Sequence, residues 1–241
     1  MNQFRTLVFV VLACALWLVP ARADDPPKKL AAEQRNELRA KMKSLNDAGL
    51  KAYRAGRIDE AEKAYVEGVE ICRRLYPSDE YPGGHPVLAN SIHILAMFYL
   101  IHKRYADAEP LCREAFTMYK RVYQENHRYV DQSLNNLAFV YQALGKYADA
   151  EPLYKDALAL RKHLHKGDHP DVAQSLNNLA FLYRAQGQFI DAEPLYVESL
   201  AMRKRLHPRQ DHPEVALGLG NLAALLQARG QYAHAEPLCR D

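Results

Sequence analysis

The chain has 241 residues, of which 49% are hydrophobic, and its 32 basic residues nearly balance its 29 acidic ones. Two of the basic residues, Arg5 and Arg22, lie in an N-terminal segment without acids, so the rest of the chain carries 30 basic and 29 acidic residues. This balance gives no support for a nucleic-acid partner. Three of the four cysteines lie beyond that segment, and an odd number does not indicate a disulfide framework.

Residues Met1–Ala23 have the layout of a secretory signal peptide, ending in the small-x-small sequence Ala21-Arg22-Ala23. The apolar run Leu7–Val19 has 13 residues, whereas a membrane span needs about 20. We therefore expect an exported protein, periplasmic or extracellular, with residues 24–29 as a polar, proline-containing tether. A retained N-terminal membrane anchor is one alternative. Lipid attachment at Cys14 is another, and it is disfavoured because it would leave an apolar stretch on the mature chain.

Behind the tether, the sequence predicts a long helix and then a repeated unit. Residues Leu30–Ala55 contain no proline and one glycine and are rich in Ala, Leu, Lys, Glu and Arg, which favours a helix. A fixed period follows, which is typical of a solenoid of stacked units. The string Ala-Glu-Pro-Leu recurs at intervals of 42, 42 and 43 residues, beginning at Ala108, Ala150, Ala192 and Ala235.

Each unit is predicted to contain two helices, A and B. In the best-defined unit, helix A spans about Pro170–Gln186, Gly187 ends it, and helix B spans about Phe189–His207. Apolar residues recur every three or four positions in both, so each helix has one apolar face. Alanines recur within these faces, and we expect them to let the two backbones approach closely. They are Ala138, Ala180 and Ala223 in the A helices and Ala150, Ala192 and Ala235 in the B helices.

This alternation resembles the tetratricopeptide repeat in its 42-residue kinesin light-chain variety. The matching residues are Leu137, Ala138, Tyr141, Gly145, Tyr147, Ala150, Tyr154 and Ala157, with counterparts 42 residues later. The resemblance covers about Ser44–Asp241. It implies an all-α, right-handed superhelical solenoid of antiparallel helix pairs, which we expect to fill residues 30–241 with about four and a half repeats.

The sequence departs from the repeat pattern in three places. The first unit, Leu45–Leu75, is degenerate and has Gly68 where later units have Ala or Ser. Lys103 stands where the other units have glycine. The last unit stops at Asp241, inside its second helix, without the polar cap that a solenoid normally needs. We therefore expect either that the chain is part of a longer protein or that a partner covers this end, with self-association of two copies as one form of that contact.

In tetratricopeptide arrays the A helices line a concave groove, and the resemblance implies the same here. Spacings of four, three and four residues place one row of each A helix on the groove side. Asparagine recurs in these rows, and its amide offers both a donor and an acceptor to the backbone of an extended peptide. The alternative is that the amides bridge neighbouring helices. The candidate groove residues are Asn90, Gln132, Asn136, Phe139, Gln174, Asn178, Phe181 and Asn221.

The other chemically distinctive residues are assigned packing or capping roles. Cys112 and Cys239 occupy a tyrosine position of the motif and are expected in the core. Basic residues in the last turns of B helices, such as Arg161-Lys162 and Arg203–Arg205, are expected to compensate the helix dipole, with a basic strip for acidic partners as the alternative. Histidines before prolines, such as His169, are expected in turns, and no metal-ligand spacing is found.

No nucleophile–base constellation and no phosphate-binding glycine loop is found in the sequence, so we expect no catalytic residue, metal or cofactor. The predicted function is a non-catalytic scaffold that binds a peptide or protein segment in its groove, without a nucleic-acid partner or a small-molecule substrate. The alternative is that the chain is the sensor or scaffold part of a longer protein with a separate effector domain. The sequence does not identify the partner.

Overall fold

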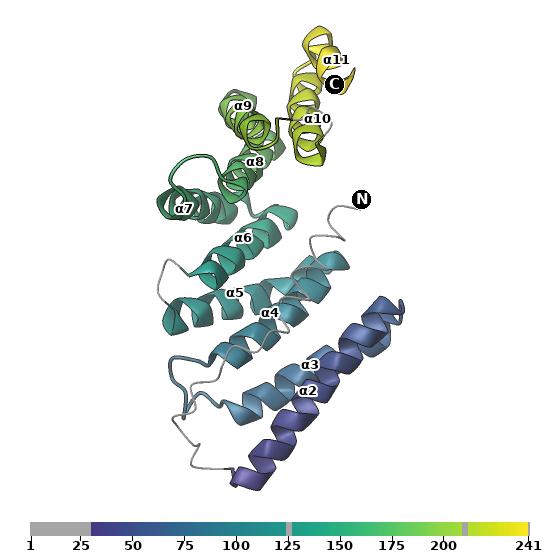
Figure 1. Ribbon diagram of the computed structural model, residues 1–241, viewed down its shortest axis with the longest axis vertical. Helices are drawn as coiled ribbons and strands as arrows, with labels where there is room; N and C mark the ends of the chain where they lie inside the picture. The colour runs from purple at the N-terminus through teal and green to yellow at the C-terminus, as the bar shows by residue number, and fades with distance from the viewer. Residues whose placement is uncertain (1–29, 124–126, 209–211, 241) are drawn as a thin grey trace. The chain divides into compact units, whose positions relative to one another are not determined.

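The structure is a computed structural model that describes residues 30–123, 127–208 and 212–240 (Figure 1). The predicted signal peptide and tether, residues 1–29, lie outside the described part. The described residues form ten α-helices and no strand, and none of these helices is long and apolar enough to cross a membrane. The chain divides into two compact units, Met1–Val140 and Tyr141–Asp241.

The first unit is built from helix hairpins. α2 packs against α3, α4 packs against α5, and α3 packs against α4, so the first hairpin stacks on the second. The helices are α2 (Ala32–Arg54), α3 (Ile58–Leu75), α4 (Pro86–Ile101), α5 (Tyr105–Val122) and α6 (Arg128–Ala143), whose last residues belong to the second unit. The long helix predicted for residues 30–55 is therefore confirmed.

The second unit continues the same alternation. α8 packs against α9 and α10 against α11, while α7 contacts α8 and α9 contacts α10. The helices are α7 (Tyr147–Leu164), α8 (Pro170–Ala185), α9 (Phe189–Leu206), α10 (Pro213–Ala228) and α11 (Tyr232–Arg240). The helix pair predicted for residues 170–207 is confirmed to within one residue at each end.

The A helices end where the sequence places glycine. The residue after the A-helix cap has a positive φ in every unit, a conformation that glycine adopts without a Cβ clash. The glycines are Gly56, Gly145, Gly187 and Gly230, with φ between 73° and 76°. Lys103 takes the same place after α4 with φ 59°, and it is the one non-glycine residue with positive φ among those described. The equivalence predicted for Lys103 is therefore confirmed, at the cost of local strain.

The contact between A and B helices is made through the recurring alanines. Ala180 of α8 and Ala192 of α9 are completely buried, in one cluster with Tyr196 and Leu225. Ala108 and Ala150 are equally inaccessible in α5 and α7. The predicted packing face is thus confirmed, and its tyrosines fill the space beside the alanines.

The cysteines divide differently from the prediction. Cys112 is buried, as expected for a core position, but Cys239 is exposed. α11 packs against α10 through Ala235 and Leu238, and Cys239 lies outside this contact. The expectation that Cys239 lies in the core is wrong.

The close contact at the buried alanines predicts that a larger side chain there destabilises the protein. Ala150→Leu should lower the unfolding free energy by about 1–3 kcal/mol, because the added atoms have no space between the helix backbones. The matched control is Ala148→Leu on the exposed side of the same helix, which should leave the melting temperature nearly unchanged. Equal thermal unfolding curves for the two variants would contradict the packing assignment.

Lys103 makes a prediction about backbone strain. A side chain in the left-handed region costs about 1–2 kcal/mol, so Lys103→Gly should stabilise the first unit by about 1 kcal/mol. Lys103→Ala keeps the Cβ atom and should give no such gain. Thermal unfolding of the three proteins tests this, and a Lys103→Gly protein no more stable than Lys103→Ala would refute it.

Candidate functional site

The candidate groove residues lie along the A helices, and we call them the A-helix stripe. In the first unit they are Asn90 on α4 and Gln132, Asn136 and Phe139 on α6, all half-buried. The amide nitrogen of Asn136 lies 3.1 Å from Met97 Sδ on α4. The ring of Phe139 meets Tyr105 edge-on, with ring centres 6.1 Å apart.

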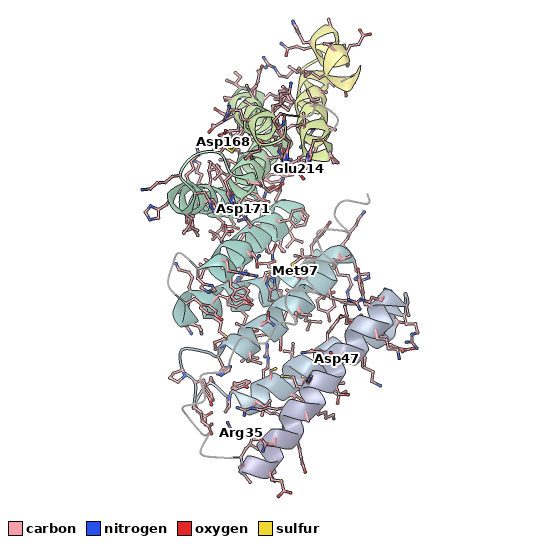
Figure 2. All side chains as sticks on the ribbon, viewed as in Figure 1. Arg35, Asp47, Met97, Asp168, Asp171 and Glu214 are labelled. Atoms are coloured by element: carbon pink, nitrogen blue, oxygen red, sulfur yellow. The ribbon has the colours of Figure 1, made fainter. Side chains whose placement is uncertain are left out.

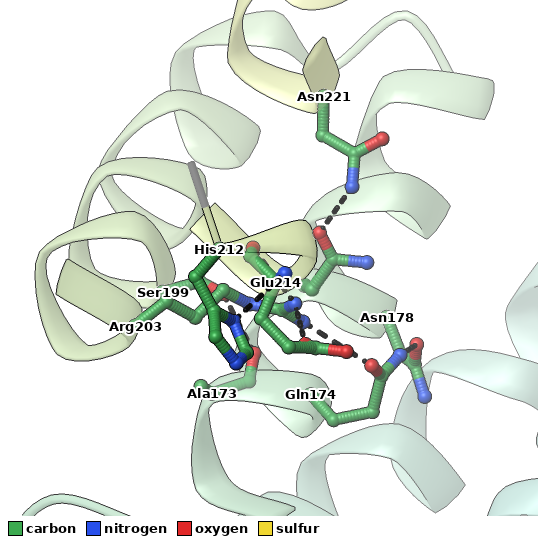
Figure 3. A network of polar contacts seen from close by, with 9 residues as sticks. Ala173, Gln174, Asn178, Ser199, Arg203, His212, Glu214 and Asn221 are labelled. Atoms are coloured by element: carbon green, nitrogen blue, oxygen red, sulfur yellow. Dashed lines mark hydrogen bonds and ion pairs between the residues drawn. The ribbon is translucent and has the colours of Figure 1, made fainter. Parts of the chain in front are cut away.

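In the second unit the A-helix stripe comprises Gln174, Asn178 and Phe181 on α8 and Asn221 on α10 (Figure 3). Gln174 Nε2 donates to Asn178 Oδ1 at 2.6 Å. Asn221 Nδ2 donates to Asn177 Oδ1 on α8, also at 2.6 Å. Phe181 is 42% exposed, and the Arg184 guanidinium lies 4.8 Å from the centre of its ring.

The asparagines combine features of the two predicted roles, bridging neighbouring helices and binding a peptide backbone. Asn136 and Asn221 each reach the preceding A helix, as a bridge between helices would. Both remain partly exposed, and neither side-chain oxygen accepts a hydrogen bond from the described residues. A bridging amide can therefore still offer its oxygen to an incoming N–H group.

A buried arginine behind the A-helix stripe was missed by the sequence analysis. Arg203 of α9 is 2% exposed, and its Nη2 donates to Gln174 Oε1 at 3.2 Å. Because Gln174 in turn donates to Asn178, the guanidinium positions the amide of the stripe through one intermediate side chain (Figure 3). Arg203 also forms an ion pair with Glu214 on α10. No local pattern predicts this contact, because Arg203 belongs to a B helix and Gln174 to an A helix.

The basic residues at the ends of the B helices connect successive repeats. Arg161 is buried and donates to Asp171 O at 2.9 Å and to Ser175 Oγ at 3.0 Å. Lys162 pairs with Glu198 of the next B helix at 3.2 Å, and Arg205 makes two bonds to Asp168, of 2.5 and 2.7 Å. Arg161, Lys162 and Arg205 lie in the last turns of their helices, as predicted, and each of them is buried or paired with an acid.

The turns between repeats share a pair of stacked aromatic rings, which we call the junction stack. The residue that follows each B helix lies against the histidine that caps the next A helix, and that histidine's Nδ1 accepts a bond from the backbone N–H two residues later. The pairs are Tyr76 with His85, Tyr123 with His127, His165 with His169, and His207 with His212, with ring centres 3.4–4.0 Å apart. The turn role predicted for the histidines before prolines, His85, His169 and His212, is confirmed.

The most displaced pKa values belong to buried packing groups. Burial raises the pKa of the Cys72 thiol to about 11 and that of Cys112 to about 12. Burial also lowers the pKa of His93 and His85 to about 4, with a contribution from the nearby Arg39 in the case of His85. These thiols are thus made less nucleophilic, whereas catalysis requires the opposite shift.

An open depression lies elsewhere, on α3. It is lined by Asp59, Glu62, Lys63, Val66, Glu67 and Glu70. Glu62 within it is held by Arg104 at 2.8 Å. None of the candidate groove residues lines it.

Comparison with known families decides the classification. A family model described as tetratricopeptide repeat matches residues 87–163 and 129–205, and a second model of that description matches residues 215–241. These matches cover more than half of the chain. The chain belongs to the tetratricopeptide repeat family. No curated protein sequence matches it.

Solved structures similar to this tetratricopeptide repeat protein support the same fold. A putative kinesin light chain from Podospora anserina with TPR-like repeats shares 24% identity and a TM-score of 0.72, over 87% of this chain and 94% of that one. BtubC (BKLC) from P. vanneervenii shares 22% identity and a TM-score of 0.69, over 99% and 88%. A Rap conjugation gene regulator of plasmid pLS20, solved with the Phr* peptide, shares 15% identity and a TM-score of 0.59, over 99% and 62%. Tetratricopeptide repeat proteins are in general non-catalytic scaffolds for protein interactions.

The buried histidine His93 makes the stability of the protein depend on pH. Its pKa falls from 6.5 in the unfolded chain to about 4 in the fold, so acidification protonates the unfolded state first. Stability is therefore full above pH 6.5 and declines as the pH falls toward 4, by up to about 3 kcal/mol from this residue. His93→Phe should reduce the loss of unfolding free energy between pH 7.5 and 4.5, measured by urea unfolding. An identical loss in parent and variant would contradict the assignment, and their difference at pH 7.5 measures the packing effect alone.

Proposed function

We propose that this tetratricopeptide repeat chain binds an extended peptide or protein segment along its A-helix stripe, without catalysing a reaction. The observation that carries the proposal is the recurrence of a partly exposed asparagine amide at one position of three A helices. These residues are Asn136 on α6, Asn178 on α8 and Asn221 on α10.

The chemistry of an amide suits a peptide backbone. Each peptide unit of the partner presents one N–H donor and one C=O acceptor, and a side-chain amide can pair with both kinds of group. Such contacts make little demand on the partner's sequence. Phe181, which is 42% exposed on the same helix as Asn178, adds an apolar surface for a side chain of the partner.

The buried network supports pre-organisation of the A-helix stripe. Arg203 holds Gln174, and Gln174 holds Asn178, at 3.2 and 2.6 Å. An amide fixed before binding loses less side-chain entropy when the partner arrives. The Rap regulator solved with the Phr* peptide is a structural relative that holds a peptide, which favours the same class of partner here.

We also propose a peptide or protein partner in preference to nucleic acid. Several basic residues at the ends of the B helices are buried or paired with acids: Arg161 and Arg203 are buried, and Lys162 and Arg205 pair with Glu198 and Asp168. Export through the segment Met1–Ala23, self-association through the last helix pair, and a role as the repeat part of a longer protein stay predictions.

The test compares partner capture by the parent chain and by an Asn136→Ala, Asn178→Ala, Asn221→Ala variant. Affinity capture from an envelope extract, followed by mass spectrometry, should recover a partner with the parent chain. A synthetic peptide from that partner should bind the variant at least about tenfold more weakly. The matched control is Asp156→Ala with Lys204→Ala, which alters exposed residues of the B helices.

Stability must be separated from binding, because Asn221 and Asn136 also contact neighbouring helices. Only variants with the melting temperature of the parent are compared, and Phe181→Ala provides a second variant at an exposed side chain. Equal peptide affinity for the parent, the triple variant and Phe181→Ala would exclude the A-helix stripe as the binding site.

A further inference from the structure

The junction between α7 and α8 brings together three metal-ligating side chains, His165, His169 and Asp171, within seven residues of the sequence. His165 follows the last turn of α7, His169 caps α8, and Asp171 lies in the first turn of α8. One ligand atom from each lies within 4.8 Å of the others. The side chains are 31%, 36% and 53% exposed, so an ion can reach them from solvent. Figure 2 labels Asp168, which precedes α8, and Asp171 in its first turn.

Two of the three ligand-atom separations at this junction match those around one tetrahedral ion, and the third, between the two histidine nitrogens, is within 4.8 Å. Zinc bonds of about 2.0–2.2 Å place two ligand atoms of a tetrahedron about 3.3–3.6 Å apart. Asp171 Oδ2 lies 3.6 Å from His165 Nε2 and 3.5 Å from His169 Nδ1. The carboxylate is therefore already at ligand distance from both imidazoles, and only the two rings must turn out of their parallel stack for their lone pairs to converge.

The other junction stacks lack this donor set. Tyr76 and Tyr123 take the place of His165 after α3 and α5, and a phenol is not a usual zinc ligand. The α9–α10 junction has two histidines, His207 and His212, but the carboxylate of Glu214 there is bound by Arg203. Only the α7–α8 junction, among those described, offers two imidazoles and a carboxylate that is not bound by a cationic side chain of the described residues.

Ser175 explains why Arg161 does not bind the carboxylate of Asp171, which stays beside the two histidines. At this junction the buried Arg161 donates to Ser175 Oγ and to the main-chain oxygen of Asp171. In the next repeat the position of Ser175 is taken by Gly218, which has no hydroxyl group. Arg203 accordingly forms an ion pair with the carboxylate of Glu214.

We propose that His165, His169 and Asp171 form a binding site for a divalent transition-metal ion of the zinc type, with the fourth position open to water or to a group from a partner. Two imidazoles and one carboxylate are a donor set that suits Zn²⁺, and also Ni²⁺ and Cu²⁺. The ion takes the His169 lone pair that otherwise accepts the Asp171 N–H, 3.2 Å away. It then links the end of one repeat to the start of the next and stabilises the second unit.

The experiment measures Zn²⁺ binding by isothermal titration to the chain from residue 24, made without a polyhistidine tag and with Cys239→Ser to remove the exposed thiol. The key variant is His165→Tyr, because tyrosine keeps the ring stack seen at the first two junctions and removes the ligand. Asp171→Asn is the second variant. The matched control is His207→Tyr at the next junction.

We expect one saturable Zn²⁺ site per chain in the parent and in His207→Tyr, and binding at least about tenfold weaker in His165→Tyr and Asp171→Asn. Added Zn²⁺ should raise the melting temperature of the first two proteins and not that of the second two. Absence of a saturable site in the parent would overturn the proposal. Equal weakening in His207→Tyr and His165→Tyr would also overturn it, since binding would then be a property of scattered surface histidines.

Discussion

The helix pairs of this protein depend on one contact, the close approach of A and B helices at completely buried alanines. Ala180 and Ala192 show it most clearly, with Tyr196 filling the space beside them. A larger residue at either alanine would separate the backbones, so this face of each helix is committed to packing. Three surfaces remain for function: the outer side of the A helices, the outer side of the B helices, and the turns between repeats. Both the A-helix stripe and the α7–α8 junction lie on surfaces of this kind.

The contact between successive repeats is less uniform than the contact within them. The residue eleven positions after the B-helix alanine is buried in each complete unit and faces the next A helix, yet its chemistry changes every time. It is Cys72, Tyr119, Arg161 or Arg203. Cys72 lies 3.1 Å from Ser91, Tyr119 stacks on Tyr129, and Arg161 donates to Ser175. Because Gly218 removes the hydroxyl in the last case, Arg203 turns to Glu214 and Gln174, which links the core of this repeat to the A-helix stripe.

Local features of the sequence predicted most of the fold. The glycines after the A helices and the apolar residues at three- and four-residue spacing are signals within one helix or one turn, and the period of 42 or 43 residues repeats them along the chain. The structure confirms the positive φ at the glycines and the burial of the recurring alanines. Lys103 was correctly aligned with the glycines although its residue type argues against a positive φ, because the repeat register outweighed the local preference.

The contacts missed by the sequence analysis join different helices. The bond from Arg203 to Gln174 crosses 29 residues, and its existence depends on how far a side chain reaches across the packed interface. The meeting of His165 with His169 and Asp171 depends on the turn that brings the end of one helix against the start of another. Cys239 was misplaced for a related reason: repeat register predicts a core position only where a neighbouring helix covers it.

The A-helix stripe itself combines a repeated and a varied position, and the two have different consequences for binding. Asn136, Asn178 and Asn221 repeat one amide, whereas the equivalent residue on α4 is the buried Ile94. Three residues further along, the four A helices carry Met97, Phe139, Phe181 and Ala224. Repeated amides contact a backbone that is the same in every peptide, so they supply affinity without choosing a partner. Discrimination between partners must then come from the varied position, where the small side chain of Ala224 differs from the exposed phenyl ring of Phe181. The proposed binding mode therefore assigns affinity and specificity to two different positions of the A helices.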